Sequence, residues 1–187
     1  MVTLPVTRPR PPRREGMLVL TAETHHRKQS AGLLLYRCKE SGPEVLLVHP
    51  GGPYWARKDE HAWSMPKGEF AADEDAFAAA RREFEEETGF APRGAATPLG
   101  VLKTSGKAIH AWAIEGDWEP LALRSNSFAM EWPPRSGRTK TFPEVDRASW
   151  FDLTTARTKI HRGQLALIDR LEALLANESR ARAPGGD

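Results

Sequence analysis

The sequence predicts a single α/β domain. Its 187 residues correspond to the usual size of one domain. Short apolar runs typical of strands alternate along the chain with segments whose apolar residues recur at helical spacing. The hydrophobic fraction of 40% supplies enough material for one packed core, unlike a disordered composition. We therefore expect most of the chain to fold.

Residues 1–28 are expected to form a disordered, Pro/Arg-rich tail. Proline removes backbone donors, and the first 16 positions hold four prolines and four arginines with few apolar side chains. Such arginines can contact RNA phosphates, but four charges without interleaved aromatic residues argue against nucleic acid as a partner. Met17 is an alternative start of the same protein.

The first two strands are predicted to form a hairpin. Apolar runs at residues 31–36 and 44–49 are separated by residues 40–43, which contain a Gly-Pro pair. Their continuous apolar character is typical of strands buried on both faces. Cys38 follows the first run and is interpreted as a small residue at a strand end. Because a lone cysteine cannot form an intramolecular disulfide, we expect a reduced, cytoplasmic protein.

The clearest helix is predicted over residues 73–88. Asp73 is the expected N-cap, and Gly89 can supply the left-handed residue that ends a helix. Phe77 and Phe84 lie seven residues apart, so they share a narrow stripe that faces the core.

Three further strands and one more helix complete the predicted domain. Strands are expected at residues 99–103, 109–114 and 144–151. Residues 164–176 form an amphipathic helix whose leucines share one face. Residues 120–141, with three prolines and scattered arginines, are expected to be a long functional or covering loop. Residues 177–187 are expected to fray.

Acidic residues are concentrated at positions 69–87. Eight acidic and two basic residues give this segment a charge of −6. Glu83, Glu86 and Glu87 stand at i, i+3 and i+4, so their carboxylates project from one helix face within about one turn. Like charges at this spacing repel unless a cation lies between them, and magnesium prefers carboxylate oxygens. A solvated acidic face is the alternative for an arbitrary glutamate-rich helix.

The spacing around these glutamates resembles the Nudix box. That box consists of Gly, five residues, Glu, seven residues, Arg-Glu, an apolar residue, any residue, Glu-Glu, any residue, Gly and an apolar residue. Residues 68–90 match every position, with Gly68, Glu74, Arg82, Glu83, Phe84, Glu86, Glu87, Gly89 and Phe90. Chance would produce this match in about one chain in a million. The chain is therefore similar to the Nudix hydrolases.

The resemblance implies a Nudix-type α/β/α sandwich with a mixed β-sheet over residues 29–176. It also implies a metal-dependent enzyme that hydrolyses a nucleoside diphosphate linked to another group. Glu83, Glu86 and Glu87 would bind Mg²⁺, with Mn²⁺ as a possible substitute, together with the backbone carbonyl of Gly68.

Catalytic roles also follow from the resemblance. Arg82 would orient the metal-binding glutamates, and Glu83 or Glu87 could act as the general base. Glu144 stands a few residues before a tryptophan and resembles a metal-site glutamate of Nudix diadenosine tetraphosphate hydrolases. It is therefore a further catalytic and metal-binding candidate, and Glu131 is a second candidate for the general base.

Three more residues have expected roles around the box. Lys67 precedes Gly68 and could place a point charge on a phosphate. Trp63 lies close to the same turn and is the preferred contact for a nucleobase, although a tryptophan is more often part of a core. By position in the box, Glu74 would form a salt bridge that anchors the loop.

The leading functional hypothesis is a pyrophosphohydrolase of dinucleoside polyphosphates such as diadenosine tetraphosphate. Residues 66–69 and 144–150 resemble that subgroup, whereas its frequent tyrosine after the box is missing here. The second hypothesis is a pyrophosphohydrolase of nucleoside triphosphates or RNA 5′ ends, and the third is a non-catalytic nucleotide-sensing module. The expected partner is a small nucleotide rather than a membrane, and the oligomeric state is open.

Overall fold

The computed structural model describes residues 28–104 and 106–182. Most of the expected tail, with its arginines, lies outside these residues. Lys28 does not belong to a tail, because it begins the first strand of the sheet. No helix of the described ranges is both long and apolar enough to cross a bilayer.

A mixed sheet forms the centre of the fold. In the described residues it contains β1 (Lys28–Lys39), β2 (Gly42–Pro50), β3 (Lys67–Glu69), β4 (Ala96–Thr104), β5 (Lys107–Glu115) and β8 (Val145–Asp152). The strand order is β4-β5-β1-β2-β8, and β3 also pairs with β1. Strands β1 and β5 are parallel, whereas the other pairs are antiparallel. The predicted hairpin β1–β2 is confirmed.

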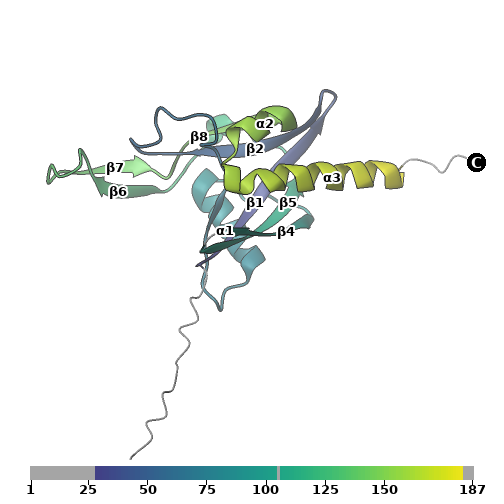
Figure 1. Ribbon diagram of the computed structural model, residues 1–187, viewed down its shortest axis with the longest axis horizontal. Coiled ribbons are helices and arrows are strands. Elements are labelled where there is room, and N and C mark those ends of the chain that lie inside the picture. Colours follow the sequence, from purple (N-terminus) through teal and green to yellow (C-terminus); the bar gives the residue numbers. More distant parts are fainter. Residues whose placement is uncertain (1–27, 105, 183–187) are drawn as a thin grey trace, which may run out of the picture.

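Helices cover both faces of this sheet, as its buried strands require. In β1, side chains from residue 30 to residue 36 are all buried. On one face, Phe84 of α1 (Ala76–Thr88) packs with Leu33 and Leu46. On the other face, Ile168 of α3 (Leu165–Arg182) packs with Leu34. Figure 1 shows α3 lying across the strands. The expected α/β/α sandwich is confirmed.

The helix of the box begins later than predicted. Its N-cap is Asp75, whose side chain accepts a hydrogen bond from the Ala78 N–H at 2.8 Å. Asp73 therefore lies in the turn before the helix, and the prediction of Asp73 as the cap is wrong. Gly89 ends the helix with φ 76°, and its N–H donates to the Glu85 carbonyl. This end was predicted correctly.

The segment predicted as a long loop contains a second, two-stranded sheet. A short 3-10 turn (Pro120–Ala122) is followed by β6 (Ser127–Glu131) and β7 (Thr139–Pro143), which pair as a hairpin. Phe128 lies opposite Phe142 in this hairpin. The adjacent prolines at positions 133 and 134 fall in the turn, where they interrupt no ladder bond. The hairpin projects from the main sheet (Figure 1).

The C-terminal part contains more helix than predicted. The short helix α2 (Leu153–Lys159) and a 3-10 turn (Arg162–Gln164) precede α3. Helix α3 continues to Arg182, so residues 177–182 are helical where fraying was expected. Residues 183–187 lie outside the described part of the chain.

Candidate active site

The box glutamates lie along the side of α1 that meets β3. Burial of Phe84 against the sheet fixes the rotation of the helix. Glu87 then accepts a hydrogen bond from the Lys67 N–H at 3.3 Å. Gly68 lies against Glu83 so closely that a Cβ at position 68 would overlap the Glu83 carboxylate. Only glycine therefore lets β3 approach this glutamate.

Arg82 connects three carboxylates. Its Nε and one terminal nitrogen donate to the two oxygens of Glu74 at 3.0 and 3.3 Å. The other terminal nitrogen donates to Glu83 at 2.6 Å and to Glu86 at 3.3 Å. Hydrogen bonding to Glu74 in particular raises the pKa of the Arg82 guanidinium. Arg82 is therefore placed to orient two of the expected metal ligands, and Glu74 to anchor the preceding loop.

The carboxylates of this cluster are difficult to ionise together. Burial raises the pKa of Glu87 to about 7, although the Lys67 charge acts against this shift. Burial also raises the pKa of Glu83. The negative charge of Glu144 adds to both shifts. A divalent cation would stabilise these ionised carboxylates, so their chemistry fits magnesium or manganese.

Glu144 reaches the box through a ladder of backbone hydrogen bonds. The Asn126 N–H donates to the Glu86 carbonyl at 3.1 Å, and the Glu144 N–H donates to the Asn126 carbonyl at 2.8 Å. The Gly51 N–H in turn donates to the Glu144 carbonyl at 2.8 Å. Glu131 instead accepts a backbone N–H within the β6–β7 hairpin. The structure thus brings Glu144, and not Glu131, to the box.

Trp63 does not have the exposed ring that a base contact requires. It is 5% exposed, and its ring lies edge to face with those of His49 and Phe151 at about 5 Å between centroids. Its Nε1 donates to Asp59 at 2.8 Å. Trp63 is therefore a core residue, and the prediction that it binds the base is wrong.

A cavity of about 380 Å³ lies beside the box instead. Lys67 connects the two, because its side chain lines the cavity and its N–H donates to Glu87. Half-buried Trp55 and the cation Lys107 also line this cavity. Lys107 additionally pairs with Glu69 at 3.3 Å. The sequence analysis did not connect this lysine with the site.

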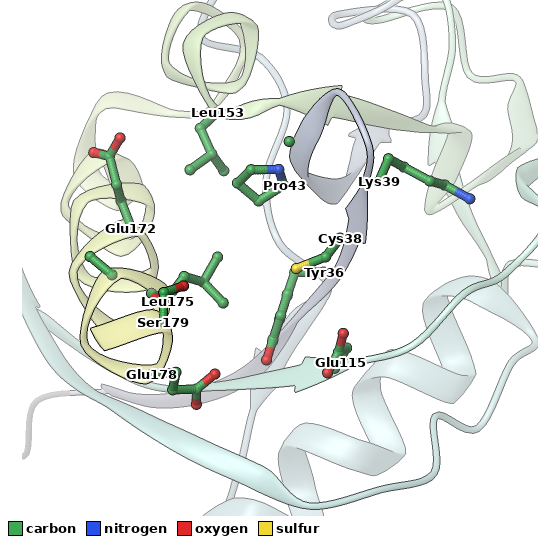
Figure 2. A pocket seen from close by; sticks show the side chains of 12 residues that line it. Tyr36, Cys38, Lys39, Pro43, Glu115, Leu153, Glu172, Leu175, Glu178 and Ser179 are labelled. Atoms are coloured by element: carbon green, nitrogen blue, oxygen red, sulfur yellow. The ribbon is translucent and has the colours of Figure 1, made fainter. Parts of the chain in front are cut away.

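A second cavity, of about 330 Å³, lies at the other end of the sheet. Figure 2 shows Tyr36 and Pro43 from the β1–β2 hairpin facing Glu172 and Leu175 of α3 across it. On β1 this end is about 20 Å from the residues that pair with β3. It is therefore remote from the box glutamates.

The expected metal ligands are close together but do not converge on one point. Within the described ranges, no group of three or more His, Cys, Asp or Glu side chains is gathered tightly enough to hold an ion. Arg82 explains part of this arrangement, because it binds Glu83 and Glu86 from the side. The backbone of Gly68 beside Glu83 and the half-buried Glu87 carboxylate still supply the oxygen ligands expected for a hard cation.

Solved structures share this fold. A mutT/nudix family protein from Listeria innocua is 19% identical, with a TM-score of 0.56, over 82% of this chain and 97% of that chain. An Ap4A hydrolase from C. elegans is 21% identical, with a TM-score of 0.52, over 80% and 98%. The NUDIX domain of Shewanella oneidensis NrtR, complexed with ADP ribose, is 15% identical, with a TM-score of 0.53, over 80% and 88%. These identities show likeness of fold.

The family follows from the sequence match. The comparison with curated proteins found no match. The NUDIX domain family matches residues 26–171, which is most of the chain and includes the whole box. The chain therefore belongs to the NUDIX family of hydrolases.

Proposed function

We propose that this chain is a Mg²⁺-dependent pyrophosphohydrolase of a nucleoside diphosphate linked to another group, with Mn²⁺ as a possible substitute. The observation that carries the proposal is the crowding of carboxylates around Gly68. Glu83 and Glu87 have raised pKa values there, and the charge of Glu144 contributes to both. An anionic diphosphate can approach such a cluster only when cations reverse the sign of its field.

Each residue of the site has a role in this chemistry. Glu83, Glu86, Glu87 and the carbonyl of Gly68 would hold the cation, with Glu144 as a further ligand. A bound divalent cation supplies positive charge at the phosphoryl oxygens and activates water for attack. The ammonium group of Lys67 adds a point charge on the phosphate.

Glu87 is the general base that the structure favours. A general base must accept a proton, and burial raises the pKa of the metal-free Glu87 carboxyl to about 7, so this carboxylate takes up a proton more readily than an exposed glutamate. One of its carboxylate oxygens, Oε2, accepts the Lys67 N–H. Its other oxygen is the one that would face the cation and the attacking water. Glu144 is the alternative base, because it lies near enough for its negative charge to raise the pKa of Glu87.

Dinucleoside polyphosphates are the first substrate class to test, with diadenosine tetraphosphate as the reference compound. Two proteins of the same fold support the wider class. One is an Ap4A hydrolase, and the other is a NUDIX domain complexed with ADP ribose. Both compounds are nucleoside diphosphates linked to another group. The single cysteine, Cys38, further supports a reducing, cytoplasmic location.

The test is hydrolysis of a substrate panel in magnesium. The panel contains dinucleoside polyphosphates, ADP-ribose, nucleoside triphosphates and triphosphorylated RNA, with products identified by chromatography. Glu86→Gln is expected to lose at least about 100-fold in kcat on the best substrate. Glu85→Gln is the matched control, because Glu85 is an exposed neighbour on the same helix.

Each outcome of this panel is informative. Equal activity of Glu86→Gln and the parent would contradict the proposed metal site. Cleavage confined to triphosphates or RNA would replace the dinucleoside class by that alternative. Binding of nucleotides without any cleavage would favour a nucleotide-sensing module.

A further inference from the structure

We propose that the cavity beside Lys67 binds the nucleobase of the substrate and selects keto bases, such as guanine and uracil, over amino bases, such as adenine and cytosine. The inference rests on the proposed function, because it assigns the base of the same substrate. It requires the cavity to lie next to the box, and Lys67 belongs to both, because it lines the cavity and its N–H donates to Glu87. A base held there places its phosphates toward the glutamates.

Gln164 gives the cavity a fixed hydrogen-bond donor. This side chain lines the cavity although it is only 3% exposed. Its Oε1 accepts the Met65 N–H at 3.0 Å. A backbone N–H can only donate, so the amide oxygen must face Met65 and the Nε2 group must face away from it. Within residues 28–104 and 106–182, this Nε2 has no hydrogen-bond partner.

The other polar side chains of the cavity are also donors where their role is fixed. His161 accepts the Gly163 N–H at its Nδ1, at 3.1 Å, so the ring proton of the neutral form lies on Nε2. The ammonium groups of Lys67 and Lys107 can only donate. The hydroxyl of Ser64 can take either role. The cavity therefore offers donors to a ligand that presents acceptors.

This donor set distinguishes the two kinds of base. Guanine presents the adjacent acceptors O6 and N7, whereas adenine places an amino donor beside N7. The amino group of adenine would face the Gln164 amide and lose a hydrogen bond without gaining another. A keto oxygen at the same place accepts from Nε2 with no rearrangement of the protein.

The remaining walls suit a flat aromatic ligand. Trp55 is half-buried, and the Lys58 ammonium lies 4.4 Å from the centre of its ring. Ile109, 6% exposed, adds an apolar surface. The volume of about 380 Å³ falls within the range of small-molecule sites.

Base selectivity is tested by hydrolysis of matched pairs, GTP against ATP and diguanosine against diadenosine tetraphosphate, in magnesium. One discriminating hydrogen-bond pair predicts a preference in kcat/KM of about 10-fold or more for the guanine compounds. Gln164→Glu keeps an acceptor for Met65 but replaces the donor by an acceptor. At a pH high enough to ionise the introduced carboxyl, it is expected to abolish or reverse the preference.

Two further variants separate this effect from damage to the fold. Gln164→Leu removes the donor without adding charge and is expected to lose the preference as well. Glu178→Gln lies on α3, the helix that follows Gln164, at the remote cavity of Figure 2, and is expected to keep the preference. Thermal melting of each variant shows whether it is folded.

Equal or better use of adenine compounds by the parent would overturn the inference, and so would an unchanged preference in both Gln164 variants. Calorimetry with GDP and ADP measures the same preference without catalysis. If no nucleotide is cleaved but GDP binds tighter than ADP in a Gln164-dependent way, the proposed function fails and the base site stands. If cleavage occurs without base preference, the base site fails and the proposed function stands.

Discussion

Replacing Arg82 by alanine tests whether this residue organises the catalytic glutamates. Two of its contacts have good hydrogen-bond lengths, 3.0 Å to Glu74 and 2.6 Å to Glu83. Its other contacts, at 3.3 to 3.4 Å, are weaker. Hydrogen bonds to charged groups contribute about 1.5–3 kcal/mol when sheltered. The Arg82 side chain is 40% exposed, so screening reduces each good contact to about 1 kcal/mol.

If the orientation of the glutamates depends on both good contacts, their loss lowers the stabilisation of the transition state by about 2 kcal/mol. At about 1.4 kcal/mol per factor of ten, this predicts a fall in kcat/KM of about 30-fold. Removing the guanidinium also removes a cation that competes with Mg²⁺ for Glu83 and Glu86. The variant is therefore not expected to need more magnesium. The loss should appear in kcat at saturating metal, where misdirected carboxylates still slow the reaction.

The assay measures initial rates on the best substrate of the panel across a magnesium titration. Arg81→Ala is the matched control, because Arg81 is exposed and donates to the Pro92 carbonyl at 3.4 Å, a weak contact. Full recovery of kcat in the Arg82 variant at high magnesium would refute an orienting role. Equal losses in the two arginine variants would refute it as well.

Three other changes act on the same cluster. Glu87 has a pKa of about 7 when metal-free and is protonated below that pH, so magnesium affinity should rise as the pH increases through 7. Calorimetry in two buffers measures the proton release that accompanies binding. If the affinity of Glu87→Gln has the same dependence on pH, Glu87 is not the group that releases the proton. Gly68→Ala should lower kcat at least about tenfold, because the new methyl group displaces the Glu83 carboxylate, and its melting temperature should change little. An unchanged kcat would show that the close approach of Gly68 to Glu83 is unimportant for catalysis. Glu144→Gln should lower kcat by about 100-fold, because it removes a proposed ligand and base. It should not lower stability, since it removes a like charge from the cluster. Losses of both activity and melting temperature would instead indicate a structural role.

Local patterns predicted the parts of the fold that depend on periodicity. The hairpin β1–β2, the strands β4, β5 and β8 and the helix of the box all follow runs that are long and apolar on the appropriate faces. The cap was placed two residues too early, because Asp73 and Asp75 are locally similar and only the Asp75 side chain accepts the Ala78 N–H. Helix α2 has only seven residues, too few for a periodic signal.

Tertiary contacts decided the parts that local patterns could not show. The β6–β7 hairpin was hidden by prolines that fall in its turn. Trp63 is buried because its backbone pairs with Ile160, nearly 100 residues away in the sequence. The cavity beside Lys67 likewise depends on Gln164, which reaches it from the 3-10 turn before the C-terminal helix. The box spacing predicted the glutamate cluster, but no spacing could predict which distant residues complete the site.

Direct measurement of metal binding tests the central claim that the box glutamates hold a divalent cation. Mn²⁺ can be titrated into the protein and the free ion followed by electron paramagnetic resonance. Glu83→Gln and Glu87→Gln are expected to weaken binding at least about tenfold, while the exposed neighbour Glu85→Gln leaves it unchanged. Binding by both site variants with the affinity of the parent would contradict the account.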